Sequence, residues 1–197
     1  MNFQENTDQN NCRLKIISTD PGINLAFTLI DTDRKELSIY ALTYSNSKDL
    51  FISLNDDVLQ YFESVGRIDK LVVEFSRFGF FASTMPHFFI LGTLYGLSRK
   101  VFKNEVYFFT GKKNDQYGIA PSTWASFMKN LLGLGVGGKF DKDESLAFGN
   151  DLLWDLHNKG WEITSNAKRL TNHITDSLSI GYYYLKKEKN IDLLAKS

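Results

Sequence analysis

Two apolar runs in the first half of the chain each end at an acidic residue, and this pattern constrains the fold most. The run 14–19 ends at Asp20 and the run 71–73 ends at Glu74, and both are rich in leucine, isoleucine and valine. Such short runs are typical of buried strands. A carboxylate at the end of a buried strand loses solvation unless a partner offsets the cost. The pattern therefore predicts two neighbouring strands whose carboxylates meet at one edge of a sheet.

The periodicity of the remaining sequence predicts an order of strands and helices. Strands are expected at about 14–20, 24–31 and 37–44, and the short turns between them indicate antiparallel pairing. A helix over 47–64 precedes the strand that ends at Glu74, so that strand should run parallel to the first. Further elements are expected at about 86–102 (helix), 105–109 (strand), 122–132, 142–159 and 167–187 (helices). This order predicts a mixed α/β sheet with helices on both faces.

Length and composition favour one cytoplasmic domain. With 197 residues, 43% of them hydrophobic, the chain suits a single well-buried core. We assign this domain to residues 13–188, between flexible tails at 1–12 and 189–197. Cys12 is the only cysteine, which excludes an internal disulfide and fits a reducing compartment. We expect neither a secretion signal nor a membrane span, because no apolar stretch is long enough.

A third acidic stretch lies near the C-terminus. His173 and Asp176 are three residues apart in a segment with helical periodicity, so they share one face. If this helix meets the two strand ends, its imidazole and carboxylate join those of Asp20 and Glu74, and the carboxylates would repel one another without a cation. Oxygen ligands with one nitrogen suit Mg²⁺ or Mn²⁺. The alternatives are a turn-forming role for Asp20 before Pro21-Gly22 and a surface pair of His173 with Asp176.

Five short segments of the chain form an ordered set of motifs. They are Asp20-Pro21-Gly22, Val72-Val73-Glu74, Leu91-Gly92-Thr93-Leu94-Tyr95-Gly96, Ala120-Pro121-Ser122-Thr123-Trp124 with Gly133-Leu134-Gly135, and His173-x-x-Asp176-Ser177-Leu178. In this order they resemble the motifs of the RuvC family of Holliday junction resolvases, of bacterial or phage type, over about residues 14–185. The resemblance implies a ribonuclease H-like fold with a five-stranded mixed sheet. The first and fourth strands would be adjacent, and the C-terminal helix would lie across them.

The resemblance also implies a homodimeric endonuclease that makes paired nicks in a four-way DNA junction. Two Mg²⁺ ions per active site, replaceable by Mn²⁺, would activate a water and stabilise the leaving oxygen. Lys139 or Lys142 would neutralise charge on the scissile phosphate. No nucleotide cofactor and no membrane are implied, and the place of action is the cytoplasm of a bacterial cell or a phage-infected host. The residues implied for metal binding and catalysis are Asp20, Glu74, His173 and Asp176.

Basic and aromatic residues supply candidate DNA contacts. The net charge is zero, from 23 basic and 23 acidic residues, but lysine and arginine outnumber acidic residues within 97–142, as on a phosphate-binding face. An aromatic cluster directly after Glu74 could stack on unpaired bases at a branch point. The alternatives are core packing for the phenylalanines and a solvated surface for the lysines, Lys139 and Lys142 included. The candidate DNA contacts are Arg77, Phe78, Phe80, Phe81, Lys112, Lys113 and Lys129.

Other functions compete with paired nicking. The segment between Glu74 and Gly92 is longer than usual for the family, which leaves flaps, forks or other branched DNA open as substrates. A non-catalytic junction-binding protein is the alternative from another class, but it would gain nothing from clustered carboxylates that face phosphate. A sugar or acetate kinase of the actin-like superfamily opens on a similar Asp-x-Gly strand. Such a kinase has two lobes, for which this chain is too short.

Overall fold

The computed structural model describes residues 13–74, 81–103, 107–108, 121–134 and 140–195. The strands in these ranges are β1 (Lys15–Asp20), β2 (Asn24–Asp31), β3 (Glu36–Thr43), β4 (Lys70–Val73), β5 (Tyr107–Phe108) and β6 (Glu162–Ser165). The helices are α1 (Ser47–Val65), α2 (Phe81–Phe102), α3 (Pro121–Leu131), α4 (Lys142–Asn158) and α5 (Asn172–Tyr183), and α5 continues into a short π-helix, η1 (Tyr184–Glu188). The strands form one sheet in the order β5-β4-β1-β2-β3-β6.

The pairing of the strands confirms the predicted topology. β1 pairs antiparallel with β2, and β2 pairs antiparallel with β3. β4 lies beside β1 and runs parallel to it, and β5 extends this parallel side of the sheet. β6 is a sixth strand, beyond the five predicted, and it pairs parallel with β3 at the opposite edge. Because β1 and β4 are parallel neighbours, Asp20 and Glu74 lie side by side at the C-terminal ends of these two strands, as predicted.

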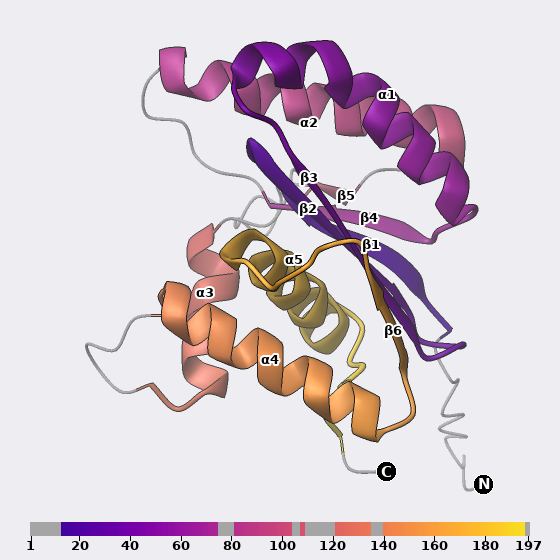
Figure 1. Ribbon diagram of the computed structural model, residues 1–197. Helices are drawn as coiled ribbons and strands as arrows, with labels where there is room; N and C mark the ends of the chain where they lie inside the picture. The colour runs from indigo at the N-terminus through magenta and orange to yellow at the C-terminus, as the bar shows by residue number, and fades with distance from the viewer. Residues whose placement is uncertain (1–12, 75–80, 104–106, 109–120, 135–139, 196–197) are drawn as a thin grey trace, which may run out of the picture.

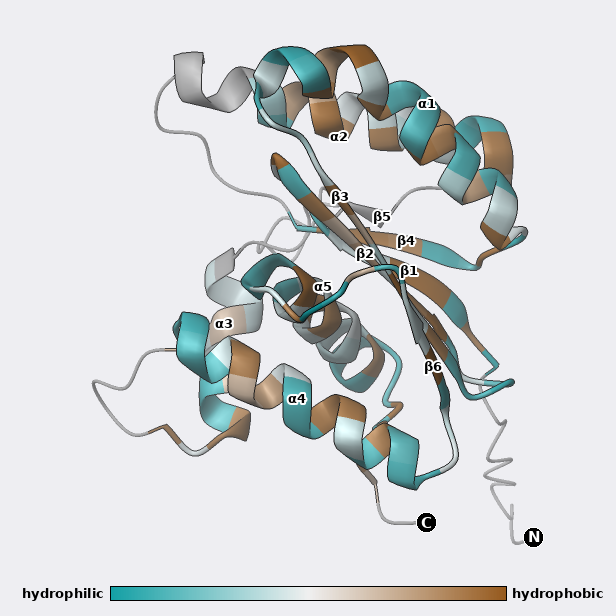
Figure 2. Cartoon of the chain, viewed as in Figure 1, coloured by the Kyte–Doolittle hydropathy of each residue, from teal (hydrophilic) through white to brown (hydrophobic). Residues whose placement is uncertain are grey.

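Two helical layers cover the sheet, with α1 and α2 on one face and α3, α4 and α5 on the other (Figure 1). Each layer has its own hydrophobic core. Ile16 belongs to the core on the α4/α5 side, and its neighbour Ile17 belongs to the core on the α1/α2 side, as the alternation of a strand requires. In Figure 2 the strands between the layers carry brown, hydrophobic stretches beside paler and teal ones. Within the described ranges, no helix has the length and apolar content needed to cross a membrane.

Small polar residues join α5 to the sheet. The Ser18 hydroxyl on β1 donates to the Ser177 carbonyl over 2.7 Å, and the Ser177 hydroxyl lies 2.7 Å from the hydroxyl of Thr28 on β2. All three residues are fully buried. A Cβ on Gly181 would lie 2.5 Å from the Ser18 hydroxyl oxygen, so only glycine allows the helix to approach this closely. These contacts fix α5 on β1 and thereby place the residues at its N-terminal end.

Two helices begin away from their predicted positions. α2 begins at Phe81 instead of Pro86, so Pro86 lies inside the helix. α5 begins at Asn172, whereas the helical periodicity predicted a start near 167. The segment before it is held to β3, because the Asn166 side chain accepts from the Ala41 amide over 2.8 Å and donates to the Ala41 carbonyl over 3.1 Å.

Residues 189–195, the described part of the predicted C-terminal tail 189–197, pack back on the domain. Asp192 forms a 2.9 Å ion pair with Lys186 and accepts a 3.0 Å hydrogen bond from the hydroxyl of Tyr182. Leu193 is buried in the core on the α4/α5 side. The predicted N-terminal tail, 1–12, lies outside the described residues.

Candidate active site

Asp20 and His173 form the centre of the site. Asp20 is the last residue of β1, and its Oδ2 lies 2.8 Å from Nδ1 of His173 in the first turn of α5. The side-chain amide nitrogen of Asn24 lies 3.4 Å from the other ring nitrogen of His173. Because an amide nitrogen can only donate, we assign the proton of the neutral ring to Nδ1, which then donates to Asp20. The hydrogen bond to Asp20 raises the pKa of His173, against the opposing effect of burial.

Glu74 is the buried carboxylate of the site. Its backbone amide donates to the Thr19 carbonyl over 3.1 Å, which extends the β1–β4 pairing beyond the end of β4. The residue is only 8% exposed. Burial raises the pKa of Glu74 to about 8, and the nearby charges of Asp20 and Asp176 add to the shift. The indole of Trp124 on α3 lies close enough to lower the pKa of Glu74. Its Nε1–H makes no well-formed hydrogen bond to a described residue.

Asp176 lies on α5 one turn after His173 and is held by α4. The hydroxyl of Ser145 on α4 donates to its Oδ1 over 2.6 Å, and the same hydroxyl lies 2.8 Å from that of Thr175. Ser145 is 2% exposed, so the bond is shielded from water. Burial raises the pKa of Asp176 to about 6, and the bond from Ser145 opposes that shift.

Lys142, at the start of α4, supplies positive charge to the same site. Its charge lowers the pKa of both Asp176 and His173, so it lies within electrostatic range of them. Lys142 is therefore a candidate lysine that the structure places near the carboxylates, whereas the other candidate, Lys139, lies outside the described residues. Lys129 lies in the last turn of α3. Lys139, Arg77, Phe78, Phe80, Lys112 and Lys113 lie outside the described residues, and Phe81 is described only as the first residue of α2.

Two further residues at the site were not predicted. Ser145 was not singled out, although it lies among Phe148, Leu152 and Leu156 on the buried face of α4, and a serine within an apolar stripe is a signal for a buried polar partner. His87 on α2 was not singled out either. It hydrogen-bonds to the Pro21 carbonyl and lies within electrostatic range of Asp20, while burial lowers its pKa. No spacing in the sequence connects His87 with Asp20.

The carboxylates and the imidazole of the site are groups that hard divalent cations bind in proteins. Three carboxylates share the site. Burial raises the pKa of Glu74 most, the repulsion from Asp20 and Asp176 adds to the shift, and a bound cation would relieve this repulsion. In the described part of the chain, however, no three histidine, cysteine, aspartate or glutamate side chains already converge as a metal cluster. Both ring nitrogens of His173 have partners, Asp20 and Asn24. His173 would therefore have to exchange one of these bonds to become a ligand.

Comparison with known proteins identifies the fold. No protein-family model matches the sequence, and no curated protein sequence matches it significantly. The RuvC of T. thermophilus in complex with a Holliday junction substrate is similar in structure, with a TM-score of 0.53, 13% identity, and coverage of 89% of this chain and 96% of that one. A second structure of Thermus thermophilus RuvC gives a TM-score of 0.53 at 15% identity, with 89% and 97% coverage.

A viral nuclease domain is similar to this chain in structure to the same degree. The human cytomegalovirus terminase nuclease domain, Mn soaked and inhibitor bound, gives a TM-score of 0.53 at 7% identity and covers 93% of this chain and 88% of that one. At such identities the likeness is one of fold. The chain has a ribonuclease H-like α/β fold, as predicted.

Proposed function

We propose that the chain is a metal-dependent endonuclease that resolves four-way DNA junctions, in the manner of the RuvC family. One observation carries the proposal: the carboxylates of Asp20 at the end of β1, Glu74 just after β4 and Asp176 on α5 lie within electrostatic range of one another, and Lys142 lies within range of Asp176. Buried like charges destabilise a fold. A cluster of this kind is therefore better explained by cation binding than by structure.

In this proposal the three carboxylates and His173 hold divalent cations. Two Mg²⁺ ions, or Mn²⁺ in their place, would supply the activation of a water molecule and the stabilisation of the leaving 3′ oxygen. His173 orients Asp20 through the 2.8 Å hydrogen bond. Ser145 holds one oxygen of Asp176 and leaves the other available. Lys142 places a positive charge where the phosphate would lie.

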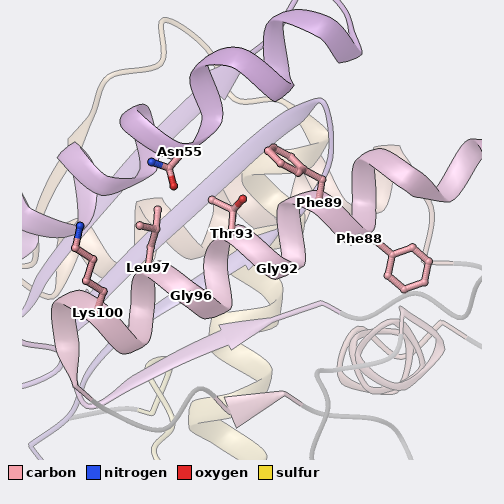
Figure 3. Close-up of a pocket in the computed structure, with 8 residues that line it drawn as sticks. All are labelled: Asn55, Phe88, Phe89, Gly92, Thr93, Gly96, Leu97 and Lys100. Carbon is pink, nitrogen blue, oxygen red and sulfur yellow. The ribbon is translucent and has the colours of Figure 1, made fainter.

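A second copy of the chain is the proposed partner, because a four-way junction has near two-fold symmetry and paired nicks need two sites. The surface that supports a dimer is a groove of about 610 Å³ between α1 and α2, shown in Figure 3. Phe88 and Phe89 are 45% and 37% exposed at one end of it. Gly92 and Gly96 lie along α2 with no atom near the position of a Cβ, so another helix could approach closely. Exposed aromatic rings beside small residues suit a helix–helix interface.

The test of the activity uses a labelled synthetic four-way junction with Mg²⁺, beside flap, fork and linear duplex substrates. We expect symmetric paired nicks in the junction and no cleavage in EDTA. Asp20→Asn, Glu74→Gln and Asp176→Asn should each abolish cleavage, since each removes a charge and keeps the shape. Asp151→Asn, which changes an exposed carboxylate of α4, is the matched control. If a site variant keeps more than about a tenth of the wild-type rate, roughly 1.4 kcal/mol in the barrier, its residue is not a metal ligand.

The same substrates separate the alternatives. Preferential cleavage of flaps or forks would assign a broader branched-DNA nuclease. Tight junction binding without cleavage in Mg²⁺ or Mn²⁺ would assign a non-catalytic junction-binding protein. If the protein cleaves linear duplex as fast as it cleaves the junction, it is not a structure-specific nuclease.

The test of the dimer is the mass in solution by light scattering at micromolar concentration. The wild type should have twice the mass of the chain, and Gly92→Leu should be monomeric, because the new side chain blocks the close approach without meeting an atom of its own chain. Asn150→Leu, an exposed position on α4, should stay dimeric. A monomeric wild type would refute the dimer.

A further inference from the structure

A second groove opens directly beside the site. It has a volume of about 310 Å³ and lies between the N-terminal end of β2, the C-terminal end of β3 and the segment 167–171 that leads into α5. His173 is one of the residues that line it. Ala26 and Ala41 contribute small side chains to its walls. A ligand in this groove would therefore approach the Asp20–His173 pair from the side of β3.

Two cations, Lys168 and Arg169, line this groove. Both side chains are exposed, and neither forms an ion pair with a carboxylate in the part of the chain that the structure describes. Thr171 lines the groove as well, and its hydroxyl makes no capping bond to α5. The groove thus offers two positive charges and a hydroxyl donor to an anion.

The backbone that carries these cations is held in place. Asn166 is bound to Ala41 of β3 by two side-chain hydrogen bonds, and its amide donates to the Ile39 carbonyl over 3.2 Å. The Ala167 amide donates to the hydroxyl of Ser165 over 3.0 Å. On the other side the segment enters α5, which is packed on β1. Cations on an anchored segment bind an anion with less loss of backbone entropy than cations on a free loop.

We propose that this groove binds the phosphates of the DNA strand next to the scissile phosphate. The inference rests on the proposed nuclease function and adds to it a binding surface for the flanking strand. The carboxylates of the site repel a polyanion, so a strand needs positive charge beside them to be held there. Lys168 and Arg169 supply that charge on the β3 side, and Lys142 supplies it at the start of α4. The strand would pass from the groove across His173 to the carboxylates.

The experiment compares two double variants that lose the same net charge. Lys168→Gln with Arg169→Gln removes the charges of the groove. Lys35→Gln with Arg67→Gln removes two exposed charges at the opposite end of the strands, one in the β2–β3 turn and one before β4. The affinity of each protein for a fluorescent four-way junction is measured by anisotropy over a series of NaCl concentrations, in EDTA and in Ca²⁺.

For the groove variant, the slope of log affinity against log salt should be smaller in magnitude by about 2 than for the wild type, because each phosphate that is no longer neutralised removes roughly one from the slope. The control variant should have the wild-type slope. A neutral methylphosphonate, scanned through the phosphates beside the cut, should weaken binding of the wild type at one or two positions. It should not weaken binding of the groove variant further at those positions.

The outcomes separate the two proposals. If the wild type binds and cleaves the junction but the groove variant keeps the wild-type slope, the groove does not bind the strand and the nuclease function stands. An equal decrease of the salt slope in both double variants would show that the effect comes from net charge alone. That result would also refute the proposed role of the groove. If the wild type neither binds nor cleaves any DNA, the proposed function fails and the groove inference fails with it. Melting temperatures of both variants equal to that of the wild type show that charge, not folding, was changed.

Discussion

Glu74→Gln should stabilise the protein at alkaline pH while it removes the proposed activity. The pKa of Glu74 is raised from 4.5 to about 8, mainly by burial and then by Asp20 and Asp176. Since the raised value belongs to the folded state, the folded protein binds this proton more tightly than the unfolded chain does. The protonated carboxyl imposes no penalty below pH 4.5. Stability is lost as the pH rises from 4.5 towards 8, because the unfolded chain then releases the proton freely, whereas the folded state must keep the proton bound or hold a buried charge.

The magnitude follows from the pKa. At about 1.4 kcal/mol per pH unit, the rise from 4.5 to about 8 sets an upper limit of roughly 5 kcal/mol on the penalty at high pH. Relaxation of the site and the buried amide that glutamine introduces both reduce the gain, so we expect about 2 to 4 kcal/mol at pH 8.5. For a chain of this length that corresponds to roughly 5 to 15 °C in melting temperature.

The assay is thermal unfolding by circular dichroism in EDTA at pH 5, 7 and 8.5. Glu74→Gln should melt well above the wild type at pH 8.5, and the difference should shrink towards zero at pH 5. Added Mg²⁺ should raise the melting temperature of the wild type more than that of the variant. Glu63→Gln, on an exposed position of α1, should follow the wild type throughout. Equal melting of the wild type and Glu74→Gln at pH 8.5 would show that Glu74 is solvated or already paired, and the reasoning would be refuted.

Three further substitutions test other parts of the structure. Ser145→Ala should raise the Mg²⁺ concentration for half-maximal cleavage roughly tenfold, the usual effect of losing a group that orients a ligand. Ser179→Ala, which removes a hydroxyl that donates to the Thr175 carbonyl, should leave this concentration unchanged. Equal shifts in both variants would refute the positioning role of Ser145. Gly181→Ala should destabilise the protein by up to about 2 kcal/mol in urea unfolding, because the cost of overpacking against Ser18, about 1 to 3 kcal/mol, exceeds the roughly 1 kcal/mol that alanine gains in a helix. A higher urea midpoint would contradict the close approach. Truncation after Lys189 should cost about 2 kcal/mol through loss of the buried Leu193, and an unchanged melting temperature would show that the segment does not pack in solution.

The order of elements in the sequence was enough to predict the centre of the fold. The helix before Glu74 predicted that β4 runs parallel to β1, the family resemblance implied that the two strands are neighbours, and the structure pairs them so. The predicted strand carboxylates consequently meet where they were expected. The approach of His173 and Asp176 to them followed from the three-residue spacing together with the family resemblance.

Features that depend on tertiary contacts could not be predicted. β6 is four residues long and mostly exposed, so its pattern does not differ from that of a loop until it pairs with β3. The start of α5 is displaced because Asn166 bonds to a strand far away in sequence. The contacts of Ser145 and His87 likewise join elements that are distant along the chain. Spacing within one element carries no information about such partners.

Among the described residues, the two cores on either side of the sheet share no buried side chain, so substitutions in one core leave the other untouched. Substitutions in contact with each other couple, whereas distant ones add. A stabilising change on α1, which packs in the core opposite α5, should therefore combine additively with changes on the site side. The core opposite α5 contains Leu50, Leu54 and Val58 of α1. Substitutions around these three residues could raise the melting temperature while the residues of the site are varied independently.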